Sequence, residues 1–507
     1  MFLRRRWPAP LLTAALGLSL ALTACSAGST ATQVGRVAGQ GAVVVGATGA
    51  PASLDFTTTG GAAIPQALMG NVYEGLVRID AAGEIVPLLA TSWEVSEDAT
   101  EYTFRLREGV TFSDGSPFNA ESAKFSIGYV QQSWTNGLKS QMDVVESVEA
   151  LDEHTLKVVL ERPSQRWLWS MGTLTGAMMS PTGVDRLATA PVGTGPYELR
   201  RFAVGESVAF TVRGDYWGEP ANRDAAIRYF SDPTSAVNAL RSGDIDVVWA
   251  MQSPELLDTL PEEYGVEVGT TNGEVLLSMN NDRAPFDDAR VRRAVVHAVD
   301  REAVNQVVWE GLAVDTGGAP VPPTDPWFTG RDHAPFDPGL SRRLLAEAGF
   351  DADHRPEITV SVPSLPYAQN ISELLYSQLR DVGFDVELNT VEFPAVWLAE
   401  VMSAQNYDMS IIAHVEARDV PALFGDPDYY LGYDNAQVRE DLLAADTAAT
   451  VAEQAEHMEE AVAAVMADAG ALTVFNLPNI VVTAPGVTGV NPTVVTDALE
   501  LAGMEKQ

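Results

Sequence analysis

The chain has 507 residues, of which 46% are apolar and 20% are charged, so it is long enough for two or three globular domains. Acidic residues outnumber basic ones by 69 to 32, which gives a formal net charge of -37. This balance argues against nucleic acid as a partner, because phosphate binding needs a basic surface. We expect most of the acidic surface to be solvated, although it would also attract cationic ligands.

The N-terminal segment has the layout of a bacterial secretion signal. Three arginines at positions 4–6 precede the apolar stretch Leu11–Leu22, which is too short to span a bilayer. The next residues, Leu22-Thr23-Ala24-Cys25, resemble a bacterial lipobox, in which the cysteine is lipidated and becomes the mature N-terminus. The resemblance implies that residues 1–24 are removed and that Cys25, the only cysteine, carries a lipid anchor. Ordinary cleavage near Ala24, which would leave a free thiol, is the alternative.

A tether and a first strand follow the lipobox. Residues 25–41 are rich in glycine, alanine, serine and threonine, which predicts a flexible tether. Ala42–Ala47 is a run of apolar, mostly β-branched residues, which predicts a buried strand.

The stretch Pro87–Tyr129 predicts a strand, a tight turn and a capped helix. Apolar and polar residues alternate over Tyr102–Leu106, as in a half-buried strand. Turn-forming residues fill Ser113–Pro117. Asn119 is a good N-cap for the helix that follows, and Glu121 lies in its first turn, where the helix dipole favours a negative charge.

Three sequence motifs in this stretch resemble those of a known family. The strings WEVSED, TFRLREGV and FSDGSPFNAE resemble the signature of the family-5 extracytoplasmic solute-binding proteins, which are the peptide- and nickel-binding receptors of ABC importers. The resemblance extends over residues 42–480, and five further motifs follow the family order: Asn71–Leu76, Pro191–Tyr197, Asp215–Trp217, Leu240–Val247 and Pro285–Asp300.

The resemblance implies an α/β fold of two lobes, the periplasmic-binding-protein fold of class II type, with an extra domain inserted in the first lobe. Chain crossovers near residues 271–278 and 468–478 would form a hinge of two strands. The expected parts are a signal peptide (1–24), a tether (25–41), lobe I (42–63, 188–274 and 474–507), the extra domain (64–187) and lobe II (275–473).

The resemblance also implies a function. The lobes would close on an extracellular solute, most often an oligopeptide or dipeptide, and deliver it to a membrane permease and its ATPase subunits. We expect a monomer that is lipid-anchored on the extracytoplasmic face of the cell membrane. Nickel or a metal chelate, a glutathione-like molecule, an opine or an oligosaccharide are alternative ligands, and a sensor lipoprotein without a transporter is an alternative role. We expect no enzyme activity, cofactor or resident metal, because no catalytic motif or phosphate-binding loop occurs.

Candidate ligand-binding residues in lobe I and the extra domain lie in three places. The small-residue loop 57–63 approaches the ligand in peptide-binding relatives, and glycine suits close backbone approach, whereas a plain surface loop is the alternative. Trp249 and Met251 follow a predicted strand, where ligands of α/β sheets often sit, and core packing is the alternative. The full set here is Thr59, Gly60, Gly61, Ala62, Trp134, Trp249 and Met251, with Trp134 and Trp249 as stacking platforms for a sugar. Trp167 and Trp169 are predicted to pack in the extra domain's core.

Lobe II is expected to begin with a helix capped by Asp287 or Asp288 that ends at Gly311. Its apolar stripe leaves Arg292 and Arg293 on the opposite face, where we expect both to be solvated.

The remaining candidates lie later in lobe II. After the predicted strand 407–412, the segment AHVEARD occupies the place where peptide-binding relatives hold the ligand's α-ammonium with an acid. Glu416 and Asp419 both fall there, and the alternative is that Arg418 and Asp419 belong to a solvated surface loop. His414 would be the metal ligand in the nickel alternative. The segment 363–370 lacks the arginine with which some dipeptide-binding relatives grip the carboxylate. The other candidates are Tyr367, Trp397 and Tyr433. Trp397 would be a third stacking platform for a sugar and is equally suited to the core.

Overall fold

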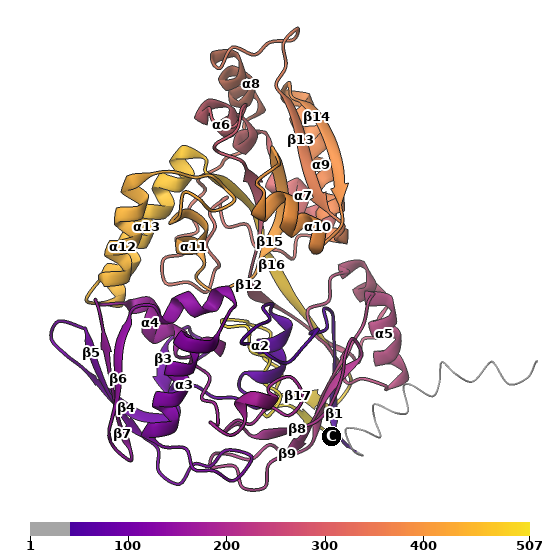
Figure 1. The fold of residues 1–507 in the computed structure, drawn as a ribbon. Helices are drawn as coiled ribbons and strands as arrows, with labels where there is room; N and C mark the ends of the chain where they lie inside the picture. Colours follow the sequence, from indigo (N-terminus) through magenta and orange to yellow (C-terminus); the bar gives the residue numbers. More distant parts are fainter. Residues whose placement is uncertain (1–40) are drawn as a thin grey trace, which may run out of the picture.

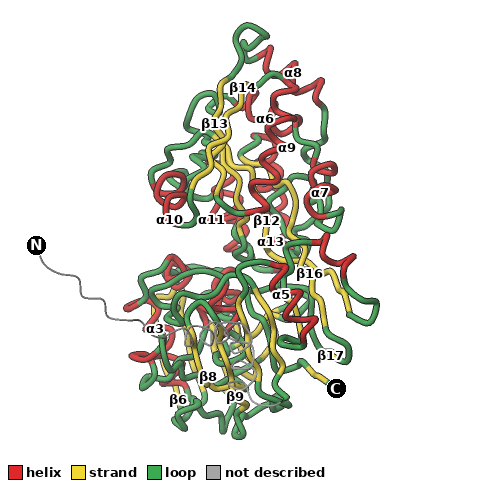
Figure 2. Tube along the Cα trace, turned by 90° about the vertical axis from the view of Figure 1, so that its right-hand side faces the viewer, coloured by secondary structure: helices red, strands yellow, loops and turns green. Residues whose placement is uncertain are grey.

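The computed structural model describes residues 41–507, which form two lobes one above the other (Figure 1; Figure 2). The predicted signal peptide, Cys25 and nearly all of the tether lie outside the described residues. Within residues 41–507, none of the helices combines the length and the apolar character needed to cross a bilayer.

One ten-stranded sheet runs through both lobes, in the order β14-β13-β15-β12-β16-β11-β1-β10-β9-β8. Its lobe I strands are β1 (Val43–Ala47), β8 (Tyr197–Ala203), β9 (Ser207–Val212), β10 (Ala225–Tyr229) and β11 (Val247–Val248). The predicted strand at residues 42–47 is confirmed as β1, which is buried throughout and lies parallel to β10 and β11. Helix α5 (Pro233–Ser242) connects β10 to β11.

Two long strands carry the chain between the lobes. Strands β12 (Gly265–Met279) and β16 (Ala471–Thr483) pair antiparallel, from Gly265 opposite Thr483 to Ser278 opposite Ala471. Their register is irregular between Thr270 and Glu274. Both strands pass through the waist between the lobes (Figure 1). These are the strands that form the predicted two-strand crossover.

The extra domain is a four-stranded sheet in the order β4-β5-β7-β6 with helices beside it. The predicted half-buried strand is confirmed as β5, with Tyr102, Phe104 and Leu106 buried. The predicted N-cap is also confirmed, because Asn119 Oδ1 accepts a hydrogen bond from Ser122 N. The elements are β2 (Val77–Ile79), β3 (Ile85–Pro87), β4 (Ala90–Val95), β5 (Glu101–Leu106), β6 (Val145–Asp152), β7 (Thr155–Leu160), α2 (Ala63–Leu68), α3 (Ala120–Ser133) and α4 (Gln165–Ser170).

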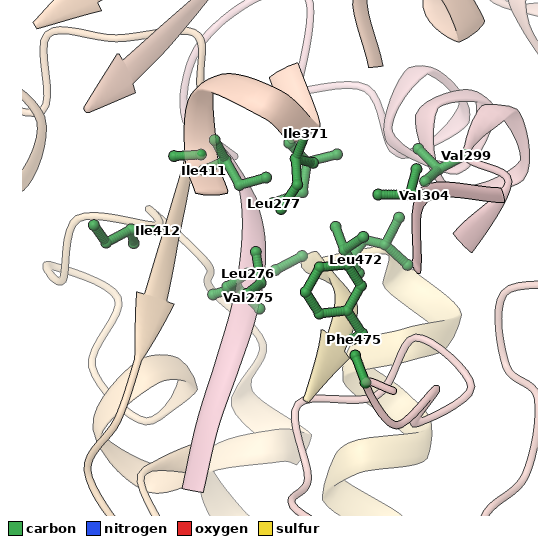
Figure 3. Close-up of a cluster of buried hydrophobic side chains, with 14 of the residues drawn as sticks. Val275, Leu276, Leu277, Val299, Val304, Ile371, Ile411, Ile412, Leu472 and Phe475 are labelled. Carbon is green, nitrogen blue, oxygen red and sulfur yellow. The ribbon is translucent and has the colours of Figure 1, made fainter. Parts of the chain in front are cut away.

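Lobe II packs helices around β13, β14 and β15. Figure 3 shows part of its core, where Leu277 of β12, Ile411 of β15 and Leu472 of β16 lie with Ile371 and Phe475. The elements are β13 (Glu357–Pro363), β14 (Asp385–Val391), β15 (Met409–His414), α6 (Ala289–Ala298), α7 (Arg301–Trp309), α8 (Pro338–Glu347), α9 (Pro366–Val382), α10 (Ala395–Trp397), α11 (Val420–Phe424), α12 (Ala436–Thr447) and α13 (Val451–Asp468). Strands β17 (Val487–Thr488) and β18 (Glu505–Lys506) form a separate pair near the C-terminus.

The first helix of lobe II differs from the prediction in two ways. Asp288 caps α6, but α6 ends at Ala298, and Asp300 caps the separate helix α7, which itself ends before Gly311. Arg292 is buried, not solvated, and its guanidinium donates to the backbone oxygens of Phe286, Asp468 and Ala469. The reason is tertiary, since the end of α13 brings unpaired carbonyls to this face.

Candidate ligand-binding site between the lobes

A cavity of about 630 Å³ lies between the extra domain and lobe I on one side and lobe II on the other. This volume falls in the range of small-molecule sites. The first wall includes residues 59–62, the region of α4 and the C-terminal segment 496–498. The second wall includes residues 414–419 and parts of α11, α12 and α13.

Seven of the predicted residues line this cavity. They are Thr59, Gly60, Gly61 and Ala62 on one wall and His414, Glu416 and Asp419 on the other. Gly61 has a φ of 110°, which disfavours other residues, and the space around both glycines is open. The tertiary structure thus brings together two segments more than 350 positions apart in the chain.

The six other predicted residues do not line the cavity. Trp134, Trp249, Met251 and Trp397 are buried in hydrophobic cores. Trp134 packs edge-on against Phe56, and Trp397 Nε1 donates to Ser410 Oγ at 3.0 Å. The expectation that Trp249 and Met251 extend into the cleft is therefore corrected, because the chain after β11 turns into the packed interior instead.

The two tyrosines are occupied by intramolecular hydrogen bonds. The Tyr367 hydroxyl accepts from Ala413 N at 2.8 Å, and the Tyr433 hydroxyl donates to Asp468 Oδ2 at 2.9 Å. Both side chains hold neighbouring backbone and helix ends in place outside the cavity lining.

The lobe II wall carries a compact group of ionisable side chains. His414 ends β15, Glu416 lies in the loop that follows, and Asp419 precedes α11. His414 Nδ1 lies 4.0 Å from Asp419 Oδ2, and His414 Nε2 lies 2.9 Å from the Tyr430 hydroxyl. One ligand atom from each of His414, Glu416 and Asp419 lies within 4.8 Å of the others, so the three side chains could hold a metal ion.

Burial governs the protonation of this group. It lowers the pKa of His414, so the imidazole is favoured in its neutral form. Burial, followed by the charges of Glu416 and Asp325, raises the pKa of Asp419 well above its usual range. Burial and Glu416 also raise the pKa of Asp497, on the opposite wall, to about 7. A cationic ligand group would restore the ionised carboxylates.

Two further buried acids lie behind this group. Glu274 of β12 is 1% exposed, and neither carboxylate oxygen has a hydrogen-bond partner in residues 41–507. Burial, followed by Asp419 and Asp325, raises its pKa well above its usual range. Burial raises the pKa of Asp325 to about 7, although Arg418 opposes this. The strand that links the lobes therefore carries an acid that is favoured in its protonated form.

The two walls contact each other at Trp169 and at Asp446. Trp169, expected in the extra domain's core, instead lines the cavity beneath Arg418 of lobe II, whose Cζ lies 3.3 Å from the ring centroid. Trp167 is buried in the core as predicted. Asp446 accepts from Arg162 Nη1 (2.5 Å), Ser164 Oγ (2.8 Å) and Arg166 N (3.1 Å), so α12 is attached to the start of α4 (Figure 1).

Several residues that line the cavity could not be recognised as candidate site residues from the sequence. Arg166, Asp446 and Asp497 lie in segments without a distinctive motif, and only the fold brings them to one cavity. Trp169 stands out in the sequence, but its position in a helix does not distinguish a core residue from one at an interface between lobes.

A two-lobed α/β protein with a cavity enclosed between its lobes is a binding protein of the periplasmic type. Residues 84–434 match the family "Bacterial extracellular solute-binding proteins, family 5 Middle", and the chain belongs to this family, as the resemblance predicted.

Curated relatives and solved structures agree with this assignment. The chain is 30% identical over 345 residues to a putative ABC transporter peptide-binding protein of Brucella ovis, covering 64% of this chain and 63% of that protein. It is 28% identical over 339 residues to the glutathione-binding protein GsiB of Shigella flexneri, covering 65% of each. The matched regions thus span just under two thirds of these relatives. The structure of NikA from Brucella suis with Fe(III)-EDTA is similar, with a TM-score of 0.82 and 22% identity over 92% of this chain and all of that one, and it confirms the two-lobed fold.

Proposed function

We propose that this protein is the substrate-binding subunit of an ABC importer and that it captures a short peptide between its lobes for delivery to a membrane permease. Two relatives are named for peptide and glutathione binding, which supports this choice of ligand class. One chain supplies both walls of the cavity, so a monomer suffices for capture. A ligand that contacts both walls favours the closed form, because it binds that form more tightly than the open one.

The observation that carries the proposal is the set of carboxylates that line the cavity. Among residues 41–507, no lysine or arginine lies within 4.0 Å of the carboxylates of Glu416, Asp419 and Asp497. Asp419 is buried, and a buried carboxylate is costly to ionise unless a cation pairs with it. The α-ammonium of a peptide fits this requirement through charge-assisted hydrogen bonds.

Native mass spectrometry of the folded protein, purified without unfolding, tests this proposal. We expect adducts that resolve into peptide masses and that disappear when the same sample is denatured. A defined non-peptide adduct would overturn the peptide assignment. If the protein is recovered bare, a thermal-shift panel of di- to pentapeptides replaces the first measurement, and the absence of any shift would count against the proposal.

A metal ion or metal chelate is the second candidate, favoured by the arrangement of His414, Glu416 and Asp419. A nickel adduct in the same spectra that is lost after His414→Ala, but kept after substitution of the exposed His354, would establish it.

We also propose that lipidated Cys25 anchors the protein on the extracytoplasmic face of the cell membrane. Cys25→Ser should move the protein from the membrane fraction to the soluble fraction. Retention of that variant in membranes would contradict the lipid anchor.

A further inference from the structure

Four arginines line the cavity, and three of them already have a carboxylate partner. These pairs are Arg162–Asp446 at 2.5 Å, Arg418–Asp325 at 3.8 Å and Arg439–Asp434 at 2.5 Å. The remaining arginine is Arg166, near the start of α4.

Arg166 is held by its backbone, while its guanidinium has no partner. Its N–H donates to Asp446 Oδ1 at 3.1 Å. Within residues 41–507, its side chain makes no hydrogen bond and no ion pair within 4.0 Å. Burial lowers the pKa of Arg166, opposed by the charges of Asp446 and Asp419. The side chain is partly buried in the cavity wall. A guanidinium carries five donors and stays charged, so an anionic ligand group in the cavity would find an unpaired cation there.

We propose that Arg166 binds an anionic group of the ligand, namely the C-terminal carboxylate of a peptide, and so makes the site selective for zwitterionic ligands. This inference rests on the proposed function. Arginine matches a carboxylate in shape as well as in charge, because it can form two parallel hydrogen bonds with it.

The arrangement of the walls agrees with this assignment. Arg166 lies on the extra-domain wall, whereas Glu416 and Asp419 lie on the lobe II wall. The segment 363–370 contains no arginine, and its Tyr367 hydroxyl is occupied by Ala413 N. A peptide with its ammonium at the acids and its carboxylate at Arg166 would bridge the two walls and stabilise the closed form.

The test compares two peptide libraries on the intact folded protein by native mass spectrometry. Both libraries contain the same random di- to pentapeptides, one with free C-terminal carboxylates and the other with C-terminal amides. We expect the wild-type protein to retain the free acids at least tenfold more than the amides, the size of effect of one charge-assisted hydrogen bond. Arg166→Gln should reduce this preference to about twofold or less, and Arg166→Lys should restore part of it.

Arg200→Gln is the matched control, because it removes the same charge at an exposed strand position paired with Asp224. It should keep the full preference for free acids. Thermal unfolding of each variant checks that it is folded, and if Arg166→Gln is not, Arg166→Lys carries the comparison.

Three outcomes separate the inference from the function on which it rests. Equal retention of acids and amides by the wild-type protein would overturn the anion site and leave peptide binding intact. A preference that persists in Arg166→Gln would assign the carboxylate to another residue. Retention of neither library would overturn the proposed peptide function, and the role of Arg166 with it.

Discussion

The two walls of the cavity are built in different ways. On the extra-domain wall, Ser164 caps α4, and Asp446 from the opposite lobe satisfies Ser164 and the backbone of Arg166. On the lobe II wall, residues 414–419 form a loop in which Arg418 has a φ of 56°, a value that side-chain-bearing residues rarely adopt. The backbone at the start of α4 is held by hydrogen bonds across the lobe interface, whereas the second wall holds the buried carboxyl of Asp419, with no lysine or arginine within 4.0 Å among residues 41–507.

The two sets of contacts therefore serve different purposes: one joins the lobes, and the other is available to a ligand. The hydrogen bonds of Asp446 join the two lobes directly and need no ligand to form. The loop 414–419 contributes Asp419, whose ionised form is disfavoured by burial and would be favoured by a bound cation. Such a loop on a rigid scaffold is a common place for binding residues.

We expect the largest effect on ligand affinity from substituting the acidic residues of the loop 414–419. Asp419→Asn should weaken binding of peptides with a free α-ammonium by at least tenfold, because it removes a charged hydrogen-bond acceptor. The loss should be much smaller for N-acetylated peptides. Isothermal titration calorimetry measures both, with Glu146→Gln at an exposed strand position of the extra domain as the control. Unchanged affinity in Asp419→Asn and in Glu416→Gln would remove the ammonium site.

The same wall predicts proton release on binding. The pKa of Asp419 is raised by burial, and a bound ammonium would lower it again, so binding should release protons at pH values between the usual and the raised pKa of this carboxyl. Affinity should therefore increase as the pH rises through this range and fall above about pH 8, where a peptide amine loses its proton. Titrations in buffers of different ionisation enthalpy measure the release, and its absence would mean that Asp419 is already ionised in the empty site.

A smaller effect is expected from breaking the contact between the walls. Asp446→Ala removes three hydrogen bonds across the interface and should weaken closure by about 1–3 kcal/mol, since Arg162 is half exposed and its ion pair adds little. Small-angle X-ray scattering should show a larger radius of gyration without ligand. Asp434→Ala removes an exposed lobe II carboxylate instead, and should leave the dimensions unchanged. The same radius in both variants would show that Asp446 does not hold the lobes together.

The smallest effect concerns stability. The pKa of Glu274 is raised, so the folded protein holds a proton that the unfolded chain loses above its usual pKa near 4.5. This group's contribution to stability is therefore present at low pH and is lost as the pH rises from that value toward the raised pKa. Glu274→Gln should be more stable than the wild type at pH 8 by on the order of 1 kcal/mol, and the difference should vanish near pH 4. Thermal unfolding across this range measures it, and a difference that does not change with pH would contradict the protonated state.

Local elements of the fold were predictable from the sequence. The alternation over residues 102–106 and the cap at Asn119 were confirmed because both depend on neighbouring residues. Trp249 and Arg292 show where such reasoning ended. The position of Trp249 just after a strand does not determine whether its side chain lies in a cleft or in the core. Likewise, the position of Arg292 on the polar face of a helix does not determine whether the end of a distant helix packs over that face.

The sequence by itself determined the family, the two-lobed α/β class, the periodic elements and the small-residue and acidic segments of the candidate site, because each depends on a local pattern or an ordered set of motifs. The tertiary structure alone decided which side chains meet in the cavity. Arg166, Trp169, Asp446 and Asp497 come from distant segments, and their charges acquire a role only when the antiparallel strands β12 and β16 bring the lobes together. Pairing and burial depend on distance in space, which local sequence does not encode.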